Sequence, residues 1–445
     1  MRQHGRIART AQVVVLGTLV LLCAAAPAEQ VKLNVELAHP MLQAGRKQKT
    51  YLKVGLTGFE MTAEERTPVN VAIVLDKSGS MSGEKIARAK EGAIMAVNRL
   101  RPDDIVSVVA YSQGVEVVVP ATKARDREKI VAAINRMEAG GRTALFAGVS
   151  KGAREVRKFI DPGRVNRVVL LSDGLANVGP SSPRELSEVG ASLNKEGIAV
   201  TTFGLGLDYN EDLMTQLAVK SEGNHFFART AADLRKAFDL EFSIGLAVVA
   251  QEVVVKIACA DGVRPVRVLN ADADITNGRV VVGLNQIYSK REAALLLEVE
   301  VSPGEVGEVR DVASVEVTYA NMQTETTDRL TSDLSVRFVK SARAAREHRN
   351  REIMVAVVQK LANEQNIRAM ELRDEGKVKE AQQALQQNAE YLRANAHELD
   401  SKKLEKEAEE NEEDAEAVES ARRYKARRKD MQDRQSEQGP PSLAF

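Results

Sequence analysis

The amino-acid sequence predicts an α/β protein built on a doubly wound, mostly parallel sheet, with an all-β sandwich-like unit and a C-terminal helical region. Changes in hydrophobic period along the 445 residues carry this prediction. Apolar strands alternate with amphipathic helices over residues 68–246, and a two-residue period typical of half-buried strands follows over 247–340. The chain is long enough to bury more than one hydrophobic core.

The first 28 residues have the pattern of a secretory signal. Three arginines precede a short apolar run, and small residues stand at Ala26 and Ala28, which predicts cleavage after Ala28. The alternative is an uncleaved membrane anchor, although the apolar run is on the short side for crossing a bilayer. We therefore expect an exported protein, periplasmic or extracellular, that contacts a membrane only if this segment is retained.

Charge and cysteine content exclude several classes of function. Lys+Arg and Asp+Glu both total 63, so there is no net charge to attract nucleic acid or an anionic membrane. The basic residues near the C-terminus are balanced by acids and have Tyr424 as their only aromatic neighbour, so no nucleic-acid partner is expected. Cleavage of the signal would leave Cys259 as the only cysteine, which excludes an intramolecular disulfide.

Residues 29–67 contain two alternating stretches, at 31–40 and 48–59, that are typical of antiparallel strands. An isolated pair of strands is barely stable in water. We therefore hypothesise that they join the β unit predicted at 247–340, with the wound domain inserted between the two parts.

The C-terminal region is predicted to be helical because it lacks proline up to residue 435 and is rich in Ala, Glu, Lys, Arg and Gln. Residues 341–400 favour an antiparallel helical hairpin with Gly376 at the turn. A single stretch at 369–387 resembles part of a tetratricopeptide repeat. The charged blocks of residues 401–445 are typical of a solvated helix or a disordered tail.

One stretch, VAIVLDKSGSMSG at 71–83, places Asp76, Ser78 and Ser80 at alternate positions after an apolar strand. Oxygen ligands at every second residue of a tight turn suit a small hard cation. The alternative is a turn in which Asp and Ser bond their own backbone. Asp173 follows another apolar strand, and because ligands of wound sheets bind beyond the carboxyl ends of the strands, we expect Asp76 and Asp173 to meet in one crevice.

Three separated elements resemble the von Willebrand factor type A family: DKSGS at 76–80, the threonine of GGRTAL, Thr143, and the aspartate of LLSDG, Asp173. Taken alone, Thr143 would pass for a helix N-cap and Asp173 for a turn former. The resemblance covers about residues 68–246 and implies a Rossmann-like sheet with a metal-ion-dependent adhesion site. It implies that one Mg²⁺, or another divalent cation such as Ca²⁺ or Mn²⁺, is held by five side chains: Asp76, Ser78, Ser80, Thr143 and Asp173.

The same resemblance implies a binding or adhesion protein that captures an acidic side chain of a protein partner through the cation, and the predicted signal implies that this protein is exported. The layout is similar to secreted bacterial type A domain proteins and, in outline, to inter-alpha-trypsin inhibitor heavy chains and calcium-activated chloride channel regulators. We expect no enzyme, since the motif has no evident general base, no P-loop is present and His225 is predicted to be a core or strand-end residue. The alternatives are a metal-dependent hydrolase and a cell-envelope scaffold that works through the helical tail.

Overall fold

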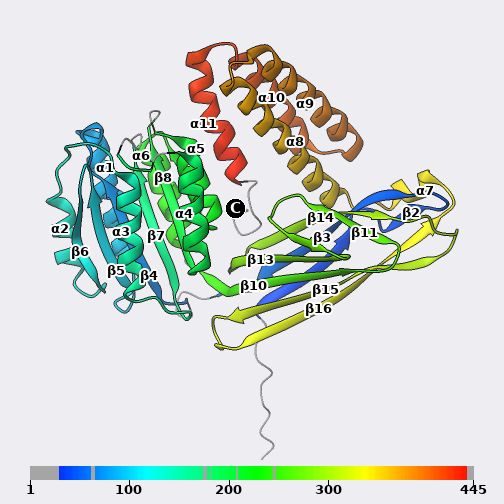
Figure 1. The fold of residues 1–445 in the computed structure, drawn as a ribbon, viewed down its shortest axis with the longest axis horizontal. Helices are drawn as coiled ribbons and strands as arrows, with labels where there is room; N and C mark the ends of the chain where they lie inside the picture. Colours follow the sequence, from blue (N-terminus) through cyan, green and yellow to red (C-terminus); the bar gives the residue numbers. More distant parts are fainter. Residues whose placement is uncertain are drawn as a thin grey trace, which may run out of the picture.

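The computed structural model describes residues 30–61, 66–173, 178–180, 182–206, 209–243 and 247–437. These residues form an α/β domain, a β unit and a helical region that lie side by side (Figure 1). The predicted export signal lies outside the described residues. Within the described part, no helix is both long and apolar enough to cross a membrane.

The α/β domain contains a six-stranded sheet in the order β6-β5-β4-β7-β8-β9. All neighbouring strands are parallel except β5 and β6, which are antiparallel. The strands are β4 (Val69–Asp76), β5 (Ile105–Tyr111), β6 (Val115–Lys123), β7 (Val165–Ser172), β8 (Ile198–Leu205) and β9 (His225–Ala228). The predicted doubly wound, mostly parallel sheet is therefore confirmed.

Helices cover both faces of this sheet, because alternate residues of its central strands point to opposite sides. In β4, Val71, Ile73 and Leu75 pack in one core with α1, α2 and α6, whereas Ala72 and Val74 pack in another with α3, α4 and α5. The helices are α1 (Glu84–Arg99), α2 (Arg127–Asn135), α3 (Leu145–Arg157), α4 (Pro183–Lys195), α5 (Glu211–Lys220) and α6 (Ala231–Ser243).

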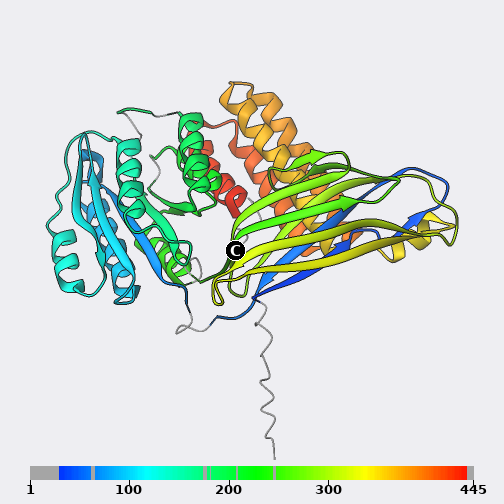
Figure 2. The same ribbon diagram turned by 60° about the horizontal axis from the view of Figure 1, so that its bottom comes forward.

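The β unit consists of two sheets, with strand orders β1-β3-β14-β11 and β12-β13-β10-β15-β16-β2, that share one core. Strand β3 pairs antiparallel with β14, so strands from before and after the α/β domain lie in one sheet (Figure 2). The strands are β1 (Val31–Leu37), β2 (Met41–Gln43), β3 (Gln48–Gly58), β10 (Val248–Cys259), β11 (Val263–Val268), β12 (Asp274–Thr276), β13 (Arg279–Tyr288), β14 (Glu292–Val301), β15 (Val309–Asn321) and β16 (Thr327–Val339). The α/β domain is thus inserted within the β unit.

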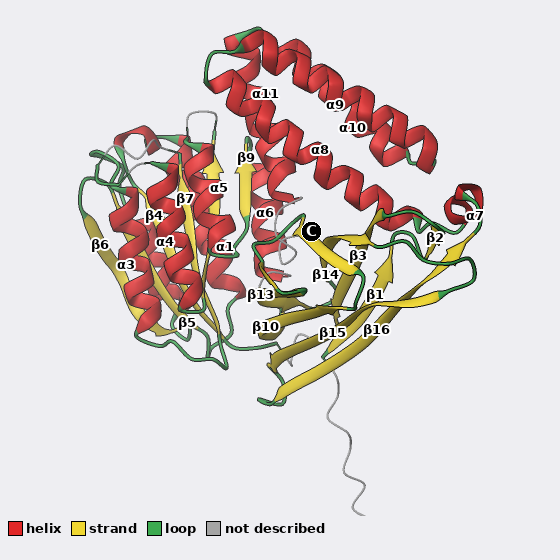
Figure 3. Cartoon of the chain, turned by 45° about the vertical axis from the view of Figure 1, so that its right-hand side comes forward, coloured by secondary structure: helices red, strands yellow, loops and turns green. Residues whose placement is uncertain are grey.

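The helical region extends beyond the predicted hairpin. Its helices are α7 (Ala342–Glu347), α8 (Arg351–Asp374), α9 (Val378–Leu399), α10 (Lys402–Ala417) and α11 (Ala421–Glu437). Gly376, with a φ of 82°, makes the turn between α8 and α9. In Figure 1, α11 lies between the other long helices and the α/β domain, and Figure 3 shows the helical region from another side.

Residues 402–437 therefore differ from the predicted solvated or disordered tail. The charged blocks carry apolar residues that pack into the bundle, including Leu404 and Met431. In addition, the buried carboxylate of Asp414 on α10 is paired with Arg427 and Arg434 on α11. The acidic and basic blocks thus bind each other, which their composition alone does not reveal.

A buried charged network joins the α/β domain to the β unit. Arg167 of β7 and Glu241 of α6 are both fully buried and form an ion pair. The Arg167 guanidinium also donates to Gln286 Oε1 at 3.0 Å and to Tyr288 Oη at 2.8 Å, both on β13. Glu241 accepts a further hydrogen bond from Thr201 Oγ1 at 2.7 Å. The guanidinium therefore has partners in both units at once.

Replacing Glu241 with glutamine leaves a buried guanidinium without its counter-charge, which costs about 3–5 kcal/mol. We expect Glu241→Gln to lower the midpoint of urea unfolding strongly. The matched control is Glu196→Gln, which breaks the partly exposed pair with Arg157 and costs no more than about 1 kcal/mol. If both variants lowered the unfolding midpoint by the same small amount, the buried pair would not stabilise the fold more than the exposed pair does.

His225 of β9 is a buried strand residue, as predicted. Its Nδ1 lies 2.8 Å from Thr202 Oγ1 and its Nε2 lies 3.1 Å from Tyr209 Oη. Burial lowers the pKa of His225 to about 3. The folded protein therefore holds a neutral imidazole at every pH at which most proteins are handled.

This lowered pKa makes folding stability depend on pH. The unfolded chain binds a proton on this residue below a pH of about 6.5, whereas the folded chain does not until about pH 3. The contribution of His225 is thus complete above about pH 6.5 and is lost as the pH falls toward 3. We expect His225→Gln to lose less stability than the wild type between pH 7 and pH 4.5, measured by thermal unfolding. Parallel curves for the two proteins, or an imidazole that titrates near pH 6 by NMR, would refute this.

Candidate metal centre

Asp76 is the last residue of β4, and three donors fix its carboxylate. Oδ1 accepts a hydrogen bond from the Ser78 amide at 2.8 Å, and Oδ2 accepts from Ser172 Oγ at 2.7 Å and from Tyr111 Oη at 3.3 Å. Ser172 and Tyr111 end the two strands that flank β4. Burial raises the pKa of Asp76, and the charge of Asp173 adds to this effect. A nearby cation would offset both costs.

Two serines connect Asp76 to Asp173. Ser78 Oγ lies 3.1 Å from Ser80 Oγ, and Ser80 Oγ donates to Asp173 Oδ1 at 2.8 Å. Ser78 and Asp173 are buried, whereas Ser80 is exposed. The structure therefore brings the four residues together in one row of oxygen atoms at the carboxyl edge of the sheet, and this row reaches solvent at Ser80.

Thr143 lies in a loop that is bound to the same turn. The Gly79 amide donates to Gly141 O at 2.9 Å, and the Gly140 amide donates to Lys77 O at 2.7 Å. Helix α3 begins at Leu145 with Ala144 as its N-cap, so buried Thr143 is not the cap that it resembles in isolation. The main chain thus places all three elements of the predicted site at one edge of the sheet.

Sequence reasoning missed three residues around this centre. Lys85, in the first turn of α1, forms an ion pair with Asp173, and Ser172 and Tyr111 orient Asp76. Ser172 and Tyr111 could have been predicted from the sequence, because each ends a strand that flanks β4, the strand of Asp76. Nothing in the sequence indicates that Lys85 turns toward Asp173.

The donor set fits a hard divalent cation. It offers two carboxylates and three hydroxyls, all of them oxygen ligands of the kind that Mg²⁺ prefers. Over the residues that the structure describes, no three His, Cys, Asp or Glu side chains gather into a metal site. A cation bound at this centre would therefore need serine and threonine hydroxyls among its ligands. Lys85 would have to leave Asp173 if that carboxylate were to contact the cation directly.

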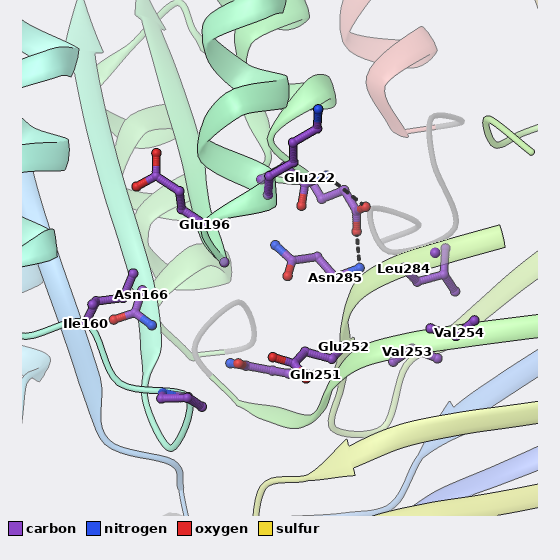
Figure 4. Close-up of a pocket in the computed structure, with 15 residues that line it drawn as sticks. Ile160, Asn166, Glu196, Glu222, Gln251, Glu252, Val253, Val254, Leu284 and Asn285 are labelled. Carbon is purple, nitrogen blue, oxygen red and sulfur yellow. Dashed lines mark hydrogen bonds between the residues drawn. The ribbon is translucent and has the colours of Figure 1, made fainter.

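A separate cleft of about 610 Å³ lies between the α/β domain and the β unit. It is at the amino edge of the sheet, beside Asn166 of β7 and Gly197 before β8. The Glu222 carboxylate bridges the two sides of the cleft, because it accepts hydrogen bonds from the side-chain amide of Asn194 and from the backbone amide of Asn285 (Figure 4). The cleft and the candidate metal centre thus occupy opposite edges of one sheet.

Comparisons with known proteins agree with this architecture. Residues 70–240 match the family model of the von Willebrand factor type A domain. The chain is 29% identical over 209 residues to uncharacterized protein YfbK of Escherichia coli K12, a match that covers 46% of this chain and 36% of that protein. It is 29% identical over 171 residues to human inter-alpha-trypsin inhibitor heavy chain H3, covering 36% of this chain and 19% of that protein. The chain therefore spans well under half the length of either relative.

The fold beyond the domain also has a solved counterpart. The structure of a von Willebrand factor type A protein from Catenulispora acidiphila superimposes with a TM-score of 0.67 and 18% identity, over 85% of this chain and 90% of that one. At this identity the likeness concerns the fold alone. The chain thus contains a von Willebrand factor type A domain at residues 70–240.

Proposed function

We propose that the chain is an exported binding protein whose type A domain captures a partner through a divalent cation. The cation would be held by the five predicted residues, Asp76, Ser78, Ser80, Thr143 and Asp173. The main support for this proposal is the row of hydroxyl and carboxylate oxygens of Ser78, Ser80 and Asp173, which is exposed to solvent at Ser80. Proteins with this domain often act in protein–protein interaction and adhesion.

The residues around the row support a binding role. Ser172 and Tyr111 hold the Asp76 carboxylate in one orientation, so little freedom is lost when it becomes a ligand. Two carboxylates nearly balance a divalent charge, and the cation, when bound, supplies a coordination position that accepts one further anionic oxygen. The partner group that suits this position is an acidic side chain. That side chain would approach at Ser80, the exposed member of the row.

Capture of partners from a cell-envelope extract tests the proposal. We expect proteins to be retained by the immobilised chain in Mg²⁺ and released by EDTA, because the bridging cation is removed. Asp76→Asn removes a ligand charge and should abolish retention in Mg²⁺, with an unchanged far-ultraviolet circular dichroism spectrum.

The control is Asp103→Asn, which neutralises an exposed carboxylate that pairs with Lys123 and Arg125, away from the metal centre. It should retain the same proteins as the wild type. Retention that survives both EDTA and Asp76→Asn would refute metal-dependent capture.

A further inference from the structure

One face of α11 is bound to the α/β domain by two basic side chains, partly buried Arg428 and buried Lys429. Arg428 contacts three carboxylates, with nitrogen–oxygen distances of 2.7 Å to Glu211, 2.6 Å to Asp212 and 2.8 Å to Asp374. The Lys429 side chain is 1% exposed and lies 2.6 Å from Glu211 Oε2. The contact thus joins the C-terminal helix to the first turn of α5.

Only some positions of the helix make this contact: besides Arg428 and Lys429, Gln432 donates to Asp212 Oδ1 and Asp430 pairs with Arg229. Arg422 and Arg423 belong to the same basic block but are exposed to solvent, whereas Arg428 and Lys429 are placed against carboxylates. Burying a charge is costly unless a partner compensates it, so this arrangement depends on the geometry of both surfaces. Glu211 and Asp212 are also at the N-terminus of α5, where negative charge is favoured by the helix dipole.

A short series of contacts leads from α11 to the candidate metal centre. Lys429 Nζ lies 4.2 Å from the centroid of the Tyr209 ring and donates to Tyr209 O at 3.1 Å. The Tyr209 ring packs directly on the backbone of Gly204, where a Cβ would come within 2.3 Å of the ring. Gly204 pairs with Ser172 in the β7–β8 ladder, and Ser172 holds Asp76 Oδ2.

From these contacts we propose that α11 regulates the metal centre of its own chain. In the docked state, Lys429 fixes Tyr209 against the end of β8, and this supports the hydrogen bond that Ser172 makes to Asp76. Undocking of α11 removes that support, loosens the turn that carries Ser78 and Ser80, and weakens cation binding. The cation part of this inference rests on the proposed function, whereas the structural support of the turn does not.

The test compares two charge reversals on one helix of the full chain. Arg428→Glu places a negative charge among three carboxylates, and the repulsion should undock α11. Arg422→Glu makes the same charge change at an exposed position. Without added metal, hydrogen–deuterium exchange should become at least about fivefold faster in Arg428→Glu over residues 198–206 and 76–85, a ratio at the lower end of typical coupling between sites. Arg422→Glu should match the wild type.

Arg428→Gln is the milder variant, because it keeps hydrogen-bonding groups and removes only the charge. It should accelerate exchange over the same segments by a smaller factor, with wild-type circular dichroism. Unchanged exchange over residues 76–85 in both Arg428 variants, while exchange in α11 itself rises, would overturn the proposal.

Calorimetric titration with Mg²⁺ alone measures the effect on the cation. We expect Arg428→Glu to bind Mg²⁺ at least about fivefold more weakly than the wild type, and Arg422→Glu to bind it equally well. Equal or tighter binding by Arg428→Glu would overturn regulation by α11, since removal of positive charge alone would favour the cation. A wild type that binds no Mg²⁺ would refute the proposed function, and the exchange experiment would still decide whether α11 supports the turn.

Discussion

The buried ion pair between Arg167 and Glu241 is the constraint on which the arrangement of the whole chain depends. It is fully removed from water, and the remaining hydrogen-bond partners of Arg167 come from the β unit. A buried charge of this kind is tolerable only when all partners are in place. The α/β domain and the β unit therefore have to assemble in one relative position, which accords with the insertion of one into the other along the chain.

Strand β7 connects this constraint to the candidate metal centre. Arg167 lies near its amino end, at the boundary with the β unit, whereas Ser172 ends the strand and Asp173 follows it. The strand that is anchored by the ion pair therefore also positions one proposed ligand and the hydroxyl that orients another. Charged contacts of α11 hold the neighbouring β8–α5 corner in a similar way. The sheet is thus fixed from two sides while Ser80 stays exposed.

Much of the fold and the composition of the site could be predicted from the sequence, because both depend on local patterns. Uninterrupted apolar runs identify the buried strands, and the alternate spacing of Asp76, Ser78 and Ser80 identifies the turn. The meeting of Asp173 with that turn follows from a general rule for wound sheets. These predictions need no knowledge of which distant surfaces pack together.

The remaining features depend on partners that are far away in the sequence. Residues 402–437 look like a solvated tail until Asp414 is seen to pair with Arg427, and until Arg428 is seen among three carboxylates. The contact of Lys85 with Asp173 likewise depends on the orientation of one side chain, which the hydrophobic period of the sequence does not predict. Buried charges are therefore the part of this structure that sequence patterns describe least well.

We propose that the row of oxygens at the carboxyl edge of the sheet binds one divalent cation. Crystallography of the full chain with Mn²⁺, located by its anomalous scattering, tests this proposal. We expect one strong peak in contact with the hydroxyl oxygens of Ser78 and Ser80, absent from crystals of Asp76→Asn. A saturating Mn²⁺ concentration that gives no peak there, or only peaks elsewhere on the chain, would contradict it.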